Sequence, residues 1–414
     1  MRVYRWCLLL FIVALAPNAP AETISHGRFD KIEMYRPQGE VRQTALFFSG
    51  ERGWTKELET IAQSLVRQGV LVAGIDSHAF FRKLEQDEGD CVFPSGDLEN
   101  LSHFLQAYYR LPAYRPALLI GESSGAEFVH AMLAQAPAGT FGGGISLGVR
   151  PKRALKKPLC PADESASSAQ PEALWLALKG DGDFQTWEPQ FASAFQRLAA
   201  STHAPPAVSA AELEDLPIVE VSSQGKGDTL AVLISGDGGW AGIDKELAAA
   251  LAKQGMPVVG LDSLRYFWTK RTPESTAADV DRLVRHYLAA WKKRSVLLIG
   301  FSQGADVMPF VVNRLPASTR ERLRTVALLS LSQTAVFEFH LQNWLGAEQD
   351  AKPVAPELLR MKGVRALCVY GEDETESLCA MPAAKSLQVL KLSGGHHFDG
   401  DYPKLASLLL SHMH

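Results

Sequence analysis

The sequence predicts an α/β protein made of two tandem units, each a mostly parallel sheet flanked by helices. Apolar strand-like segments alternate with helical ones along the chain, which is typical of a parallel sheet. One strand-and-turn pattern occurs twice, at 45–54 and at 231–240. A chain of 414 residues is long enough for two units, each with its own core.

Composition and charge indicate a globular protein. Apolar residues make up 46% and charged residues 21%, which is ordinary for this class. The net charge of −4 and the absence of long basic runs argue against nucleic acid as a partner.

Residues 1–21 are predicted to be a signal peptide. Two arginines precede an apolar stretch over 7–16, and Ala19-Pro20-Ala21 has the small-x-small form of a cleavage site, so the mature chain is expected to start at Glu22. The stretch is too short for a spanning helix, and an uncleaved anchor is the alternative. Export to the periplasm predicts an oxidising environment.

Four cysteines remain after removal of the leader, and an even number in an exported chain predicts two disulfides. The two halves of the chain favour the pairs Cys91–Cys160 and Cys368–Cys379, with free buried thiols as the alternative. The second bridge is expected to brace the acidic loop over 373–376.

An internal duplication sets the domain boundaries. Besides the strand-and-turn pattern, 118–126 matches 297–305, and each match holds a glycine-flanked serine. We expect a first α/β-hydrolase-like domain over 22–203, a proline-containing linker over 204–216 and a second domain over 217–414.

The second unit holds the predicted nucleophile. Gly300-Phe301-Ser302-Gln303-Gly304 follows the apolar run 295–299 and precedes a predicted helix over 305–313. A G-x-S-x-G between strand and helix is typical of the nucleophile elbow of α/β-hydrolases, where two glycines permit a sharp turn that exposes the serine. Ser302 is therefore predicted to be catalytic, and a simple tight turn is the alternative.

Two backbone segments are predicted to form the oxyanion hole. The N–H of Gln303 starts the helix after the nucleophile, and the glycine-rich loop 235–240 would add a second N–H from Asp237 or Gly238. The first copy has Arg52 in place of Gly238, which indicates that its function has drifted.

The acid and the base are expected after the last two strands of the second unit, in the order serine, acid, histidine. The strand 367–370 leads to Asp373 and Glu374. In the first copy, an acid (Asp183) stands at the position of Glu374 and a glycine at that of Asp373, which slightly favours Glu374. The next strand leads to His396 and His397. One of them would be the general base, and the sequence leaves that choice open.

The first unit is predicted to be a degenerate copy. It keeps an elbow serine, Ser123, and the acids Asp181 and Asp183, but it has no Gly-Gly-His-His segment. His203 has a comparable spacing but lies in a helical pattern. A structural role, or a role in shaping the substrate path, is expected.

Four further residues are candidates for substrate contacts: Asp262, Tyr266, Trp268 and Asp306. Asp306 lies on the same helix face as the nucleophile, but an acid there also suits the helix dipole. A structural role is favoured for both acids. The two aromatic residues would line a pocket or pack in the core.

The motifs of the second unit together resemble the bacterial VirJ/AcvB family: 235–240, 262–268, 300–304 and 394–398. The upstream domain makes the longer, AcvB-like arrangement the closer one. The resemblance implies a periplasmic serine hydrolase that removes the lysyl group from lysyl-phosphatidylglycerol. It also implies an association with type IV secretion and virulence.

The expected reaction is acyl transfer through the serine, and no metal or organic cofactor is implied. Expected partners are an aminoacylated phospholipid at the membrane surface and secretion-system proteins. Candidate carboxylates for the lysyl amine are Asp237, Asp262, Asp306 and Glu376. The alternatives are cleavage of another lipid ester or thioester, and a non-catalytic binding protein of the secretion or virulence machinery.

Overall fold

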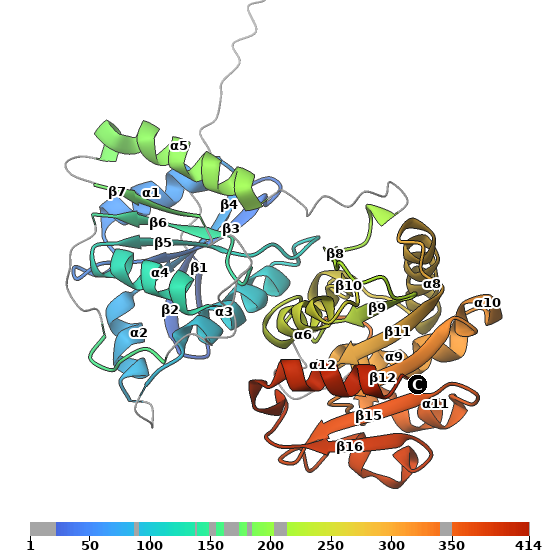
Figure 1. Ribbon diagram of the computed structural model, residues 1–414. Helices are drawn as coiled ribbons and strands as arrows, with labels where there is room; N and C mark the ends of the chain where they lie inside the picture. Colours follow the sequence, from blue (N-terminus) through green and yellow to red (C-terminus); the bar gives the residue numbers. More distant parts are fainter. Residues whose placement is uncertain are drawn as a thin grey trace, which may run out of the picture.

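The computed structural model describes residues 22–86, 91–136, 139–148, 155–160, 174–179, 184–202, 213–339 and 350–413. The strands in these ranges form two seven-stranded sheets, one from each half of the chain, and a two-stranded ribbon (Figure 1). The fold class predicted from the sequence is thus confirmed. The expected leader, Asp181, Asp183, His203 and most of the linker lie outside the described residues, so the domain boundaries stay predictions.

The first unit has the strand order β1-β2-β4-β3-β5-β6-β7, with an antiparallel hairpin at one edge and parallel pairing from β4 to β7. Its strands are β1 (Glu22–His26), β2 (Phe29–Tyr35), β3 (Gln43–Phe48), β4 (Val70–Ile75), β5 (Leu118–Glu122), β6 (Gly143–Leu147) and β7 (Trp175–Leu178). Its helices are α1 (Lys56–Arg67), α2 (Ser77–Leu84), α3 (Pro94–Tyr108), α4 (Ser124–Gln135) and α5 (Phe184–Thr202).

The second unit has the order β16-β15-β12-β11-β9-β10-β8, and only its edge strand β8 is antiparallel. Its strands are β8 (Ile218–Val221), β9 (Thr229–Ile234), β10 (Val258–Leu261), β11 (Ser295–Phe301), β12 (Leu323–Leu329), β15 (Ala366–Gly371) and β16 (Gln388–Leu392). Its helices are α6 (Gly242–Lys253), α7 (Ser263–Tyr266), α8 (Pro273–Ala290), α9 (Gln303–Arg314), α10 (Ala317–Arg320), α11 (Val354–Arg360) and α12 (Tyr402–Ser411). The ribbon pairs β13 (Thr334–Ala335) with β14 (Lys352–Pro353).

The central strands of the second sheet are covered on both faces. Every residue of β9 and β11 is buried, as expected for parallel strands between two helix layers. Alternate residues contribute to two separate clusters: Val232 and Leu298 pack with α8 and α9, whereas Leu233 and Ile299 pack with α6 and α12. This three-layer packing fixes the ends of the strands from which the site is built.

Local sequence explains where the helices begin. The Thr272 hydroxyl accepts the N–H of Ser275 at 3.1 Å, and the Ser275 hydroxyl accepts the N–H of Thr272 at 3.0 Å, so a capping box starts α8 at Pro273. Asp262 caps α7 by accepting the N–H of Arg265 at 3.2 Å.

Both predicted disulfides are confirmed. Cys91 pairs with Cys160 in the first unit, and Cys368 pairs with Cys379 in the second. The second bridge joins β15 to the short helix η4 (Leu378–Ala380), so it closes the loop that contains the predicted catalytic acids.

Aromatic residues join the two units. The indole N–H of Trp268 donates to the carbonyl oxygen of Leu111 at 2.7 Å. The Trp268 ring stacks on Phe339 with 5.1 Å between centroids, and Tyr114 of the first unit packs 5.3 Å from it. His103 on α3 completes the contact, 5.8 Å from the Phe339 ring.

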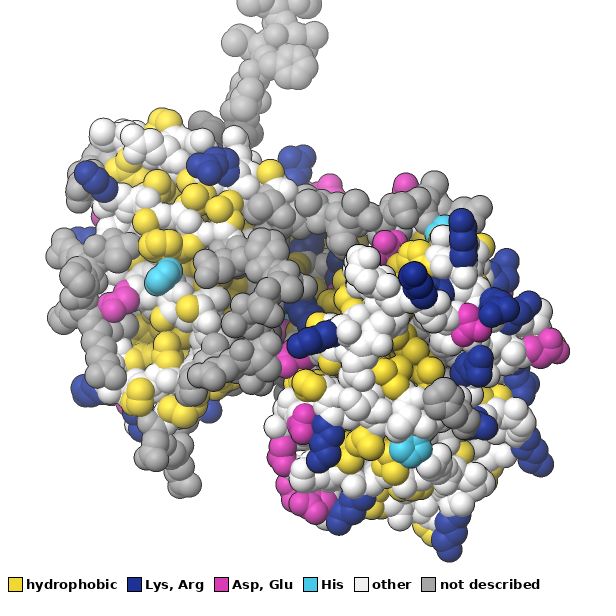
Figure 2. Space-filling view, in the orientation of Figure 1, with side chains coloured by type: hydrophobic (Ala, Val, Ile, Leu, Met, Phe, Trp, Pro, Cys, Tyr) yellow, Lys and Arg dark blue, Asp and Glu magenta, His cyan; other side chains and the backbone are white. Residues whose placement is uncertain are grey.

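None of the helices in the described ranges has the length and apolarity needed to cross a bilayer. On the face shown in Figure 2, the Lys and Arg side chains of the second unit stand singly or in small groups, several of them beside Asp and Glu side chains.

Candidate active site

Ser302 lies in a strained turn between β11 and α9. Its backbone has φ 51° and ψ −120°, a conformation that costs free energy for a residue with a side chain. The Ser302 N–H donates to the carbonyl oxygen of Leu329 at the end of β12, with N···O 2.9 Å. This is the geometry of a nucleophile elbow, which lifts the serine above the carboxyl edge of the sheet.

The two elbow glycines are required by close backbone contacts. A Cβ atom at Gly300 would lie 2.3 Å from the carbonyl oxygen of Gly304, and one at Gly304 would lie 2.1 Å from that of Ile234. Helix α9 therefore packs directly on the strands β11 and β9. This close packing holds the first turn of α9, and with it the N–H of Gln303, next to Ser302.

Glu374 and His396 form a hydrogen-bonded pair in the loops after β15 and β16. The Nδ1 atom of His396 lies 2.7 Å from Oε1 of Glu374. Asp373 is exposed, and its backbone N–H donates to Gly394. His397 is also exposed, with its ring 5.8 Å from that of Phe301. Of the two candidate acids and the two candidate histidines, the structure thus joins Glu374 and His396.

The second oxygen of Glu374 is held by two other donors. Oε2 accepts the backbone N–H of Gly371 at 2.8 Å and the hydroxyl of Ser330 at 3.0 Å. Burial raises the pKa of Glu374, but the hydrogen bonds from His396, Gly371 and Ser330 outweigh it and bring the pKa below its ordinary value. The carboxylate is thus ionised at neutral pH and can stabilise an imidazolium.

The histidine reaches the nucleophile side of the sheet. Strands β11, β12, β15 and β16 are consecutive and parallel, so Ser302, Glu374 and His396 all follow carboxyl ends at one edge. The His396 ring packs 5.0 Å from the ring of Phe301, the neighbour of Ser302. The contacts of the described residues include no hydrogen bond between the Ser302 hydroxyl and His396; in resting hydrolases this contact is often long and shortens with substrate.

The glycine-rich loop after β9 touches the nucleophile. A Cβ at Gly236 would lie 3.4 Å from that of Ser302. The Gly236 N–H donates to Asp244, which is buried at the start of α6 and whose pKa is raised by that burial. Asp237 and Gly238 are exposed beside it. The loop is thus tethered at Gly236, and two of the three predicted oxyanion donors, Asp237 and Gly238, are exposed next to it.

Three predicted substrate contacts have structural partners instead. Asp306 is buried, and its Oδ1 accepts the N–H of Ser332 at 2.7 Å. Asp262 is the cap of α7 described above. Tyr266 is fully buried and its hydroxyl donates to Asp279 at 2.6 Å. Of the two alternatives for Tyr266, pocket lining and core packing, the structure has the second, because its ring is fully buried in the core.

Trp268 and Glu376 were also predicted to contact the substrate, and they lie in different surroundings. Trp268 lies between the two units, where its indole N–H is already bonded to Leu111. Glu376 is exposed in the loop closed by the second disulfide. Of the candidate carboxylates for a cationic headgroup, Asp237 and Glu376 therefore remain open to solvent.

The first unit keeps the backbone of the elbow but has different side chains around it. Ser123 has φ 54° and ψ −113°, almost the same backbone as Ser302. Glu122 replaces Phe301, and its carboxylate lies over Gly50, where an added Cβ would meet Oε2 at 2.1 Å. Arg52 lies 3.8 Å from the same carboxylate. A carboxylate beside the serine would repel a developing oxyanion, which favours the prediction that this unit is a degenerate copy.

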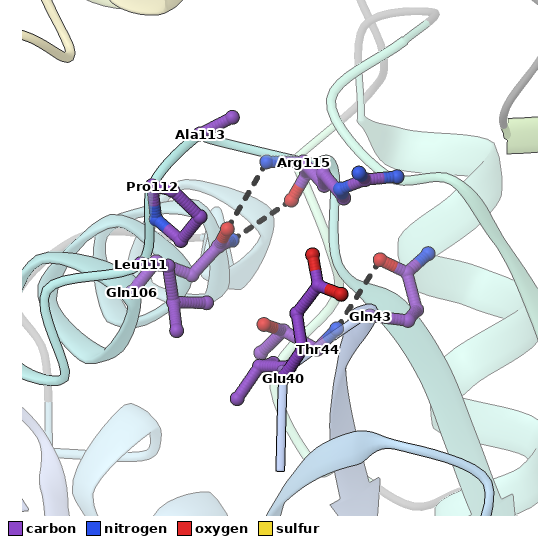
Figure 3. Close-up of a pocket in the computed structure, with 9 residues that line it drawn as sticks. Glu40, Gln43, Thr44, Gln106, Leu111, Pro112, Ala113 and Arg115 are labelled. Atoms are coloured by element: carbon purple, nitrogen blue, oxygen red, sulfur yellow. Dashed lines mark hydrogen bonds between the residues drawn. The ribbon is translucent and has the colours of Figure 1, made fainter.

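The first unit has a pocket at the amino end of its sheet (Figure 3). It is lined at the amino end of β3 by Gln43 and Thr44, and by Gln106, whose side-chain amide bridges the N–H and carbonyl of Arg115 at 3.0 and 2.8 Å. Ser123 follows the opposite, carboxyl end of the sheet. This pocket is therefore separate from the elbow.

Sequence reasoning missed Ser330. It follows β12, which carries no recognised motif. The only signal was the repeat itself: the first copy has Gly148 at the end of the corresponding strand β6.

The fold and the site define an α/β-hydrolase, with the nucleophile elbow after β11 and a paired acid and histidine after β15 and β16. A family model described as bacterial virulence protein (VirJ) matches residues 42–141 and 228–414, more than half of the chain. The chain belongs to this VirJ family. The match includes part of the first unit, which agrees with the duplication.

Three solved structures are among those similar to this chain. They are the thioesterase domain from the curacin biosynthetic pathway (16% identity, 47% of this chain and 94% of that chain, TM-score 0.33), Est1E from Butyrivibrio proteoclasticus (13%, 47% and 92%, 0.36) and naproxen esterase from Bacillus subtilis (14%, 48% and 87%, 0.33). No curated protein matches the chain.

Proposed function

We propose that this protein is a serine hydrolase that cleaves the aminoacyl ester of lysyl-phosphatidylglycerol, releasing lysine and phosphatidylglycerol. The observation that carries the catalytic part is the 2.7 Å contact between Glu374 and His396, at the sheet edge from which the strained Ser302 projects. The substrate part rests on the family resemblance and is the part that the experiment below tests most directly.

In the first half-reaction, the Ser302 hydroxyl attacks the ester carbonyl while the Nε2 atom of His396 takes its proton. Glu374 holds the opposite ring nitrogen and stabilises the imidazolium. The carbonyl oxygen becomes an oxyanion that accepts the N–H of Gln303 and an N–H from the Asp237–Gly238 turn. Collapse of this intermediate breaks the ester bond, and His396 returns the proton to the phosphatidylglycerol hydroxyl that leaves.

In the second half-reaction, water replaces the lipid alcohol. His396 takes a proton from the water, the hydroxide attacks the aminoacyl ester on Ser302, and the same N–H groups hold the new oxyanion. Lysine leaves when the proton returns to the Ser302 oxygen. Atoms and charges balance with water as the only co-reactant.

The substrate chemistry fits two further features. A lysyl headgroup is cationic, and the exposed carboxylates of Asp237 and Glu376 flank the loops that carry the oxyanion donors and the acid. Two disulfides fit the oxidising periplasm, where a lipid headgroup would reach the enzyme at the membrane surface. Secretion-system proteins are proposed as further partners on the family resemblance alone.

The test incubates residues 22–414 with vesicles that contain lysyl-phosphatidylglycerol and follows lysine and phosphatidylglycerol by mass spectrometry. Wild type and the matched variant Ser123→Ala are expected to release both products, and Ser302→Ala is expected to release neither. Release of fatty acid without lysine would replace the proposed substrate with an acyl ester. Full activity of Ser302→Ala on every ester would overturn the mechanism.

A further inference from the structure

Ser330 is a buried residue in an unfavourable backbone conformation. It follows β12 with φ 56° and a side chain that is 2% exposed. Its hydroxyl lies 3.0 Å from Oε2 of Glu374 and 3.3 Å from the backbone oxygen of His396. A left-handed φ is strained for serine but open to glycine.

The first unit shows the same backbone with the residue that suits it. The Ser302 N–H donates to Leu329, and the Ser123 N–H donates to Leu147, both over 2.9 Å, so these two leucines correspond. The next residues are Ser330 in the second unit and Gly148 in the first, where φ is 59°. The turn itself therefore works with glycine, and a serine there adds strain that the turn does not need.

We propose that Ser330 is a positioning residue for the catalytic acid. Its hydroxyl and the Gly371 N–H hold Oε2 of Glu374 from two directions, and Oε1 is left to face the Nδ1 atom of His396. A glutamate side chain has three rotatable bonds, so a single contact with the histidine would leave the carboxylate plane free to turn. The second anchor keeps the imidazole in the tautomer and orientation that a base towards Ser302 requires.

This inference rests on the proposed hydrolase function, and it makes a prediction that a structural role does not. If Ser330 served only the fold, glycine would be the better residue, and its introduction would be harmless to the reaction. If Ser330 serves the acid, glycine and alanine should both impair catalysis, although only glycine relieves the strained backbone.

The test compares Ser330→Gly and Ser330→Ala with wild type, using p-nitrophenyl butyrate hydrolysis and the rate of labelling by a fluorophosphonate probe. Both variants lose the hydroxyl, so kcat is expected to fall about tenfold, the factor that one hydrogen bond to a charged group supplies, with KM unchanged. Both variants also lose the stability that this hydrogen bond contributes. The melting temperature of Ser330→Gly is therefore expected to lie about 2 °C above that of Ser330→Ala, because only glycine relieves the strained φ.

Two controls make the result specific. Gly148→Ser places the same residue at the matching turn of the first unit, and it should lower the melting temperature without changing kcat. In a Glu374→Gln background, Ser330→Ala should lower kcat by less than twofold, because the group it positions has already lost its charge. Full additivity of the two substitutions, or unchanged labelling of Ser330→Gly, would overturn the positioning role while the hydrolase function stands. A wild-type chain that reacts with neither probe would overturn the hydrolase function, and this inference with it.

Discussion

Glu374 Oε1 lies 2.7 Å from the Nδ1 atom of His396. This contact distinguishes Glu374 from the adjacent acid and His396 from the adjacent histidine. Asp373 precedes Glu374 and His397 follows His396. Both histidines are exposed, so the contact with Glu374, and not burial, distinguishes His396 from His397. Oε2 of Glu374 accepts hydrogen bonds from Gly371 and Ser330. Substitution of each neighbour in turn therefore tests which acid and which histidine act in the reaction.

Glu374→Gln is expected to lower kcat by about three to four orders of magnitude, because a neutral amide no longer stabilises the imidazolium or fixes its tautomer. The matched variant Asp373→Asn should keep kcat within about twofold. Steady-state hydrolysis of p-nitrophenyl butyrate measures both. Equal losses in the two variants would show that the loop tolerates no change at all, and a loss confined to Asp373→Asn would reassign the acid.

The stability contributed by Glu374 should depend on pH. Its pKa in the folded chain is held below the unfolded value of 4.5 by the bonds from His396, Gly371 and Ser330, which outweigh burial. A group with a lowered folded pKa stabilises the fold above its unfolded pKa, and this contribution is lost as the pH falls through the folded pKa. The difference in unfolding free energy between wild type and Glu374→Gln should therefore be present at about pH 6 and shrink below pH 4.5.

Urea unfolding of the two proteins at several pH values between about 3 and 6 measures this difference. The difference in unfolding free energy between wild type and Glu374→Gln should decrease only below about pH 4.5 and stay constant above it. A difference that stays constant over the whole range would contradict the lowered pKa of Glu374.

The disulfide Cys368–Cys379 should matter for catalysis as well as for stability. It closes a segment with a sequence separation of 11 that contains Glu374. Loss of a crosslink of this length costs about 3 kcal/mol of unfolding free energy in the chain-entropy model. The double substitution Cys368→Ala with Cys379→Ala is expected to lower kcat, because the acid loop loses one of its two fixed ends.

The other disulfide is the matched control. Cys91→Ala with Cys160→Ala removes a longer crosslink from the first unit, so it should lower the melting temperature and leave kcat unchanged at a temperature where both proteins are folded. Thermal unfolding and p-nitrophenyl butyrate hydrolysis, run in parallel, separate the two effects. A kcat loss in the control pair would tie the first unit to the reaction.

Much of the architecture was predictable because its signals are local. The elbow glycines are needed within five consecutive residues, since Gly300 and Gly304 both face backbone oxygens at contact distance. The repeat and the even cysteine count likewise needed no three-dimensional information. The alternation of strand and helix predicted a mostly parallel sheet, and the serine, acid and histidine follow the carboxyl ends of β11, β15 and β16.

The remaining residues depended on side-chain direction, which spacing does not fix. His396 and His397 are adjacent, and only the turn after β16 decides which ring meets Glu374. Tyr266 and Trp268 lie two positions apart, yet one fills the core and the other bonds to Leu111 in the other unit. Ser330 belonged to no motif, and its role became visible only when its backbone was compared with that of Gly148.

The aromatic contact between the units shields apolar rings of the second unit from solvent. Trp268 and Phe339 of the second unit rest against Tyr114 and His103, and both of these first-unit residues are nearly inaccessible to solvent. Trimming the chain back to its catalytic half would uncover these rings and invite aggregation. The first unit thus shields Trp268 and Phe339, and we expect the second unit expressed alone to need polar residues at these two positions.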